Sequence, residues 1–323
     1  MKKQWIAIFL CLSLLATGLL GLTGCAAKVQ ADDLMKGITP EKPSGRAADD
    51  AFKNGAADFA VRLFQNTREE GKSSLISPLS VMLALSMTAN GARGETLAQM
   101  EVLLGGGIPI DTLNKYLHAY VGGLPSVEKA KLTLANSIWF KDSGFTVEEA
   151  FLQRNADYYG AAVYKSAFDK KTLRDINNWV EENTDGVIDK IVDQMDPYAV
   201  MYLVNTVLFD AEWQNIYRKH EVRDGTFTAI DGAKRTVSMM CSNESLYLDD
   251  GKATGFLKPY KNGYSFAALP VSAVTYPPKP GQKSASIRGF KLRDKLISSR
   301  KKQGAIIQTD YCPQINKQKQ IET

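Results

Sequence analysis

The 323-residue chain is poor in the side chains that most often carry catalysis and bind metals. It has two histidines, His118 and His220, and neither lies near a GxSxG sequence or a cysteine suited to act as a nucleophile. A hydrolytic triad is therefore poorly supported. The chain also has no HExxH, no P-loop and no GxGxxG after a predicted strand. We predict that the protein is not an enzyme and needs neither a cofactor nor a metal.

Cysteine is too scarce for a disulfide framework or a zinc site. Two of the four cysteines, Cys11 and Cys25, lie in or at the apolar N-terminal segment, which leaves Cys241 and Cys312 without CxxC spacing. Export would permit a bridge between these two residues. A free, buried Cys241 is the alternative that we favour.

The N-terminus has the pattern of an exported lipoprotein. Two lysines precede an apolar run from Trp5 to Leu22, and small residues follow it. Leu22–Cys25 resembles a bacterial lipobox, which implies cleavage before the cysteine and acylation of its thiol. We predict a signal peptide over 1–24 and a protein lipid-anchored through Cys25 to the outer face of a bacterial membrane. A plain cleaved signal and an uncleaved membrane helix are the alternatives, because the run is long enough to span a bilayer.

Residues 25–47 are polar and contain two prolines, so we predict a flexible tether. Residues 48–270 contain no linker or repeat, and we predict one domain. Helical periodicity predicts helices over Asp49–Glu69, Leu79–Ala89, Glu95–Leu104, Asp111–Gly122, Val147–Tyr159 and Asp169–Asn183. Apolar runs predict strands over Ser74–Ile76, Leu132–Phe140 and Val200–Phe209, with hairpins after Phe227. The fold class is therefore α+β.

Acidic residues become scarce after Pro270. Residues 271–323 contain eleven Lys or Arg and three Asp or Glu, a net charge of +8, whereas the whole chain carries +5. The first 270 residues therefore carry −3. Few aromatic residues accompany the basic ones, so nucleic-acid binding is not predicted. We predict a disordered basic tail.

Seven segments resemble signatures of the serpins, a family of serine protease inhibitors, and they occur in the serpin order. The segments are Ser74–Ser80, Asn90–Thr96, Leu134–Phe140, Ile176–Ile188, Leu203–Phe209 with Trp213, Phe227–Met240 and Leu257–Pro270. The chain is therefore identified as a member of the serpin family. The resemblance implies helices packed on mixed and antiparallel sheets, with the C-terminal third of the family fold missing or replaced.

The resemblance assigns four residues to moving parts of the serpin fold. Ser77, Ser80 and Asn205 would lie in the shutter, a packed region under the main sheet that opens to admit a new strand. Trp213 would lie at the breach, where that strand first inserts. Buried hydroxyls and amides need partners. Considered without the family, Ser77 is a helix cap, Asn205 a satisfied core amide and Trp213 a large apolar anchor.

Serpins present a loop as bait to a serine or cysteine protease, and cleavage lets that loop insert into the main sheet. The family places the hinge, the reactive bond and the closing strands after the segment that ends here at Leu269-Pro270. Nothing in residues 271–323 resembles them, so we assign no reactive loop and predict that this chain is inactive as an inhibitor. A noninhibitory, lipid-anchored binding or scaffold protein is the alternative function.

Two explanations of the tail are open. The abrupt change in charge and pattern inside a motif favours a reading-frame shift near codon 270. A basic tail that binds acidic surfaces is the alternative. The chain as written would also leave one edge of the strand over Val200–Phe209 unpaired, and exposed apolar edges favour aggregation. We therefore predict poor solubility.

Overall fold

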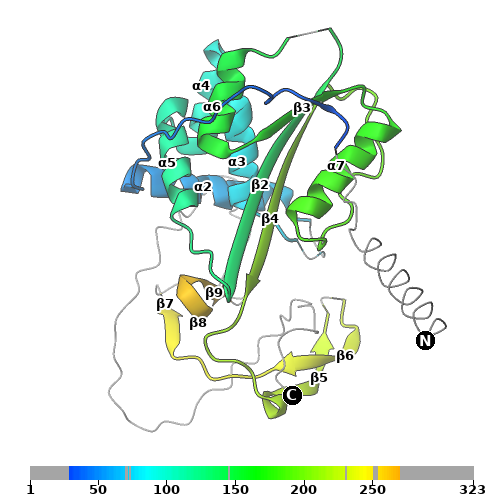
Figure 1. The fold of residues 1–323 in the computed structure, drawn as a ribbon. Helices are drawn as coiled ribbons and strands as arrows, with labels where there is room; N and C mark the ends of the chain where they lie inside the picture. The colour runs from blue at the N-terminus through cyan, green and yellow to red at the C-terminus, as the bar shows by residue number, and fades with distance from the viewer. Residues whose placement is uncertain are drawn as a thin grey trace, which may run out of the picture. The chain divides into compact units, whose positions relative to one another are not determined.

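The computed structural model describes residues 29–69, 72, 74–144, 146–229, 231–249 and 254–269. Contacts divide the chain into two compact units (Figure 1). Unit 1 comprises the chain up to Lys42 and Leu134–Thr206. Unit 2 comprises Pro43–Thr133 and the residues from Val207 onward. The predicted signal, Cys25 and the basic tail lie outside the described residues.

Unit 1 is built on one sheet. Its strands, in spatial order, are β1 (Asp32–Asp33), β3 (Ala162–Ser166), β2 (Ala130–Lys141) and β4 (Met201–Ala211). Strand β3 runs parallel to β2, with Ser137 opposite Ala162, and α6 (Glu149–Tyr159) makes the crossover that a parallel pair requires. Among the described strands β4 is at the edge. The first residues of β2 and the last residues of β4 belong to unit 2.

The core of unit 1 lies between this sheet and α7 (Lys170–Asn183). Its buried members are Trp139, Phe168, Ile176, Trp179, Val180 and Val204. Helix α7 begins where predicted, because the Asp169 side chain accepts hydrogen bonds from the Lys171 and Thr172 amides at 2.9 and 3.0 Å. The predicted helix over Asp169–Asn183 is thus present, with its N-cap at Asp169.

Residues 29–42, which lie in the predicted tether, pack on the rest of unit 1. Strand β1 pairs antiparallel with β3, and Leu34 N donates to Val163 O at 2.8 Å. Further along, Glu41 N donates to Asp157 Oδ1 at 2.7 Å. These hydrogen bonds hold the segment against β3 and α6, whereas its polar composition predicted a flexible tether.

Four helices form the first part of unit 2: α2 (Asp50–Thr67), α3 (Pro78–Ala89), α4 (Gly94–Gly105) and α5 (Ile110–Gly122). Helix α3 is apolar over most of its length, and its Met87 is fully buried. Asn114 Nδ2 on α5 donates to Asn90 Oδ1 at 2.8 Å and fixes the end of α3. The strand predicted over Ser74–Ile76 is wrong, since Leu75 is 99% exposed and these residues form no ladder.

The second part of unit 2 contains the predicted hairpins. The strands are β5 (Val222–Thr228), β6 (Lys234–Met240), β7 (Leu246–Asp249), β8 (Thr254–Pro259) and β9 (Ser265–Ala268). Strands β5 and β6 pair with each other, and β8 lies between β7 and β9. A Cβ atom at Gly255 would collide with the Ala268 carbonyl oxygen, so this close strand approach requires glycine. Cys241 carries a free thiol but is only partly buried.

Helices and mixed sheets together confirm the predicted α+β class. Within the part of the chain that the structure describes, no helix combines the length and the apolar character needed to cross a membrane.

Candidate functional site

An aromatic cluster surrounds Trp213, the residue assigned to the breach. Its indole stacks on Tyr260 with the ring centroids 4.0 Å apart and an interplanar angle of 13°, and Phe266 meets it edge-on at 6.0 Å. A β-bridge joins the backbones of Trp213 and Tyr260. Trp213 is 5% exposed, so it is the apolar anchor of this region. Its Nε1 has no hydrogen-bond partner among the described residues.

A lysine that the sequence analysis did not single out lies against this cluster. Lys258 on β8 is 4% exposed, and its Nζ lies 5.4 Å from the Trp213 ring centroid and 4.4 Å from that of Tyr217. The same atom lies 2.5 Å from Glu244 Oε1 and 3.2 Å from Ser242 Oγ. A buried ammonium is thus paired, hydrogen-bonded and covered by two aromatic rings.

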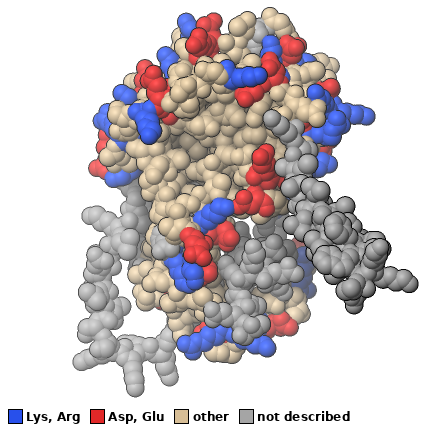
Figure 2. Space-filling model, viewed as in Figure 1, with Lys and Arg blue, Asp and Glu red and all other residues tan. Residues whose placement is uncertain are grey.

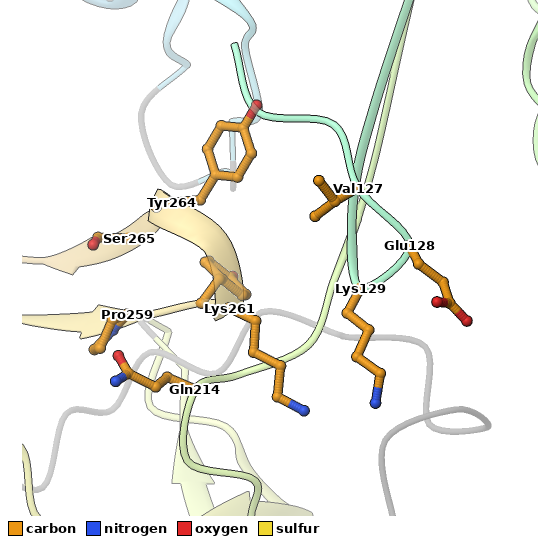
Figure 3. Close-up of a pocket in the computed structure, with 10 residues that line it drawn as sticks. Val127, Glu128, Lys129, Gln214, Pro259, Lys261, Tyr264 and Ser265 are labelled. Carbon is orange, nitrogen blue, oxygen red and sulfur yellow. The ribbon is translucent and has the colours of Figure 1, made fainter.

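An open pocket of about 590 Å³ lies next to the aromatic cluster (Figure 3). Its lining residues are Val127, Glu128, Lys129, Gln214, Pro259, Tyr260, Lys261, Gly263, Tyr264 and Ser265. Figure 3 shows the Lys129 and Lys261 side chains extending in the same direction, with Glu128 on the far side of Lys129 from Lys261. The pocket lining thus contains amine, carboxylate, amide, hydroxyl and aromatic groups.

The two lysines that line the pocket lie near one carboxylate, that of Glu212. Lys261 Nζ lies 2.5 Å from Glu212 Oε2, and Lys129 Nζ lies 3.9 Å from the same oxygen. The hydrogen bond from Lys261 lowers the pKa of Glu212. Burial raises the pKa of Tyr260 and of Tyr264, so both phenols remain neutral at physiological pH. These groups form no pair tuned for proton transfer.

In unit 1, two asparagine amides form a polar relay between strands. Asn205 Nδ2 on β4 donates to Asn136 Oδ1 on β2 at 2.6 Å. Asn136 Nδ2 in turn donates to Tyr159 O, the last residue of α6, at 2.9 Å. Asn205 Oδ1 and the neighbouring Thr206 Oγ1 are buried without partners among the described residues. The relay adds Asn136 to the predicted set, and an asparagine inside an apolar alternating strand is the signal that could have identified it.

Ser77 and Ser80 lie together in unit 2. Ser77 Oγ accepts a hydrogen bond from Ser80 Oγ at 2.8 Å and another from Ser80 N at 3.4 Å. Ser77 is the N-cap of α3, with Pro78 as the first helical residue, as the sequence predicted. The packed environment implied for Ser77 is not found, because its side chain is exposed among the described residues.

The predicted site residues belong to different units, Asn205 to unit 1 and Ser77, Ser80 and Trp213 to unit 2. Each has a local structural role there. Within the described ranges, no group of three or more His, Cys, Asp or Glu side chains is placed to hold a metal ion.

Comparison with known proteins identifies the family. The model of the serpin (serine protease inhibitor) family matches residues 54–275, more than half of the chain. Human neuroserpin is 31% identical over 203 residues, covering 59% of this chain and 48% of that protein. An uncharacterised serpin-like protein of Thermococcus kodakarensis is 28% identical over 218 residues, covering 64% and 50%.

Solved structures give the same result at higher identity. The thermophilic serpin tengpin in its native state is 52% identical with a TM-score of 0.72, covering 75% of this chain and 62% of tengpin. A loop C-sheet serpin polymer is also 52% identical, with a TM-score of 0.68. The chain belongs to the serpin family, whose general activity is protease inhibition rather than catalysis. It spans about half the length of the curated relatives that it matches.

Proposed function

We propose that the protein derives from an inhibitor of serine or cysteine proteases and that this chain, as written, does not trap them. The family match over residues 54–275 carries the first part of the proposal. The second part is supported by the composition of residues 271–323, in which no hinge or reactive loop is recognisable. Without such a loop the chain has no bait and no strand to insert.

A gel-shift assay against a panel of serine and cysteine proteases tests both parts. The protein compared with this chain is a chimera, in which the residues after Pro270 are replaced by the corresponding part of tengpin, the 52% identical serpin. We expect SDS-stable complexes from the chimera and none from the chain itself. A stable complex formed by the chain would refute its inactivity. A folded chimera that traps no protease would instead favour the noninhibitory binding or scaffold function.

The origin of the tail is tested on the nucleotide sequence. Under the frameshift proposal, another reading frame after codon 270 encodes a serpin hinge and loop. If neither alternative frame does so, the frameshift proposal fails, and the basic tail that binds acidic surfaces is the alternative. Its excess of Lys and Arg would then suit acidic surfaces.

We further propose that the protein is exported and anchored through lipid on Cys25. The lipobox-like sequence Leu22–Cys25 after an apolar run supports this. Mass spectrometry of the N-terminal peptide from bacterial membranes should find an acylated Cys25, and Cys25→Ser should abolish both the acylation and the cleavage before residue 25. An unmodified Cys25 in the mature protein would overturn the anchor.

A further inference from the structure

The ordered N-terminal segment begins very close to the proposed lipid. Val29 and Ala31 pack against the core cluster of unit 1, and Gln30 N donates to Asp175 Oδ2 on α7 at 3.1 Å. Asp175 is 4% exposed, so this contact is with the body of the unit. From Val29 onward, the N-terminal segment is therefore packed on the rest of unit 1.

The length of chain between the lipid and this attachment sets a distance limit. Four peptide steps separate Cys25 from Val29, and a fully extended chain covers about 14 Å in that length. A free tether over 25–47 would have allowed roughly 80 Å when extended. The packed segment thus removes most of the reach that the sequence suggested.

We propose that the lipid on Cys25 holds unit 1 against the membrane, with the first half of α7 facing the lipid headgroups. The inference rests on the lipid anchor proposed above. An acylated cysteine lies at headgroup level, and the headgroup layer is itself about 5–8 Å thick on each side of the bilayer. A limit of about 14 Å is close to the width of one helix with its side chains, about 10–12 Å. The helix beside Val29 therefore lies at the bilayer surface.

Strand register and contacts agree on which half of α7 is near the lipid. Asp32 pairs with Lys165 and Asp33 with Tyr164, so continuing the antiparallel register places Val29 level with Phe168, just before α7 begins. The bond from Gln30 to Asp175 reaches the second turn of the same helix. Both observations place the exit of the chain beside the N-terminal half of α7.

The charges of α7 match this orientation. Lys170, Lys171 and Arg174 are exposed on its first turns, and Glu181 and Glu182 are exposed on its last turn. Anionic headgroups attract juxtamembrane basic residues and repel carboxylates. Three exposed cations thus outnumber the one exposed carboxylate, that of the N-cap Asp169, at the end of the helix that the chain length brings to the membrane.

Spin labels on α7 test the proposal in the full, lipidated chain. Cys241 and Cys312 are first replaced by Ser, and a nitroxide is attached at Lys171→Cys or, as the matched control, at Glu182→Cys. The protein is reconstituted in phosphatidylcholine vesicles containing phosphatidylglycerol and a lipid whose headgroup chelates Ni²⁺. We expect Ni²⁺ to enhance the spin relaxation of the nitroxide several-fold more at position 171 than at position 182. Inserting a Gly-Ser linker of about 20 residues between Ala27 and Lys28 should remove the difference.

Each outcome decides between the two proposals. Acylated Cys25 with equal relaxation at both positions, or with relaxation that the linker does not change, would overturn the orientation and leave the anchor standing. A mature protein without acyl groups on Cys25 would overturn the anchor and the orientation together. If Lys171→Cys fails to fold, the label is moved to Arg174→Cys, for which we expect the same result.

Discussion

Lys258 and Glu244 form a buried ion pair in unit 2, with Nζ and Oε1 2.5 Å apart and side chains only 5% and 12% exposed. Glu244→Gln leaves the ammonium without its counter-charge in a site closed to water. We expect a loss of about 3–5 kcal/mol in the free energy of unfolding, because an unpaired buried charge is strongly unfavourable. Urea unfolding of the full chain measures it.

The control for this prediction is an ion pair of equal length on the surface. Lys190 Nζ and Asp193 Oδ1 are also 2.5 Å apart, but their side chains are 51% and 84% exposed. Asp193→Asn should cost at most about 1 kcal/mol, since water screens the pair. Equal losses in the two variants would show that burial of Lys258 contributes nothing.

The indole of Trp213 should be the main apolar anchor of the strands in unit 2. Trp213→Ala removes the stack on Tyr260 and should destabilise the protein by about 3–5 kcal/mol, whereas Trp213→Phe should retain part of the contact. Tyr198→Ala is the control, because Tyr198 is 90% exposed and should lose less than about 0.5 kcal/mol. Chemical denaturation of the three variants ranks them. If the Trp213→Ala protein is as stable as the Tyr198→Ala protein, Trp213 is not the main apolar anchor of these strands.

The asparagine relay of unit 1 predicts non-additive mutations. Asn136→Ala leaves the Asn205 amide without its acceptor, and we expect a loss of about 1–3 kcal/mol. The double variant with Asn205→Ala should lose less than the sum of the two single changes, because no amide is then left unpaired. A double-mutant cycle from denaturation midpoints measures this coupling. Strict additivity would mean that the two amides do not interact.

Stability at acid pH should depend on the bond between Tyr116 and Asp49 in unit 2. The hydrogen bond from the Tyr116 hydroxyl lowers the pKa of Asp49 below its usual 3.8. A depressed folded-state pKa adds stability that is present above the unfolded value and is lost as the pH falls through the folded value. Tyr116→Phe removes the donor.

The unfolding free energy of the wild-type protein should therefore fall more steeply below about pH 4 than that of Tyr116→Phe. The Asp49 cap of α2, which accepts from Phe52 N at 3.1 Å, is present in both proteins, so the comparison isolates the phenol. Parallel pH profiles would contradict the prediction.

Most helices and long strands were predictable because local signals agreed with the fold. The Ser77-Pro78 cap and the Asp169 cap begin α3 and α7 where the sequence placed them. A hairpin was predicted after Phe227, and the Asp231-Gly232 turn joins β5 and β6 there, with Gly232 at a φ of 79° that favours glycine. In each case neighbouring residues alone determine the geometry.

Features that depend on distant residues were not predictable in the same way. Residues 29–42 are held in place through the pairing of β1 with β3, a long-range contact that composition does not reveal. Lys258 looks like an ordinary charged residue until Glu244 and Trp213 are placed around it. Asn136 belongs to the candidate site only through its hydrogen bond with Asn205, 69 residues away in the sequence. Conversely, Leu75 is apolar by type but 99% exposed, because tertiary packing leaves it uncovered.

The pairing of the N-terminal segment with β3 and α7 also orders events in time. Gln30 and Asp175 are 145 residues apart, so the first part of the body to leave the ribosome must wait for its partner. At about 5–20 residues per second, the delay is roughly 7–30 s. Contacts of such sequence separation form slowly, since loop closure precedes any gain. Strand β1 is the first described strand to be synthesised, but its docking comes late, and until then the edge of β3 that pairs with β1 is open.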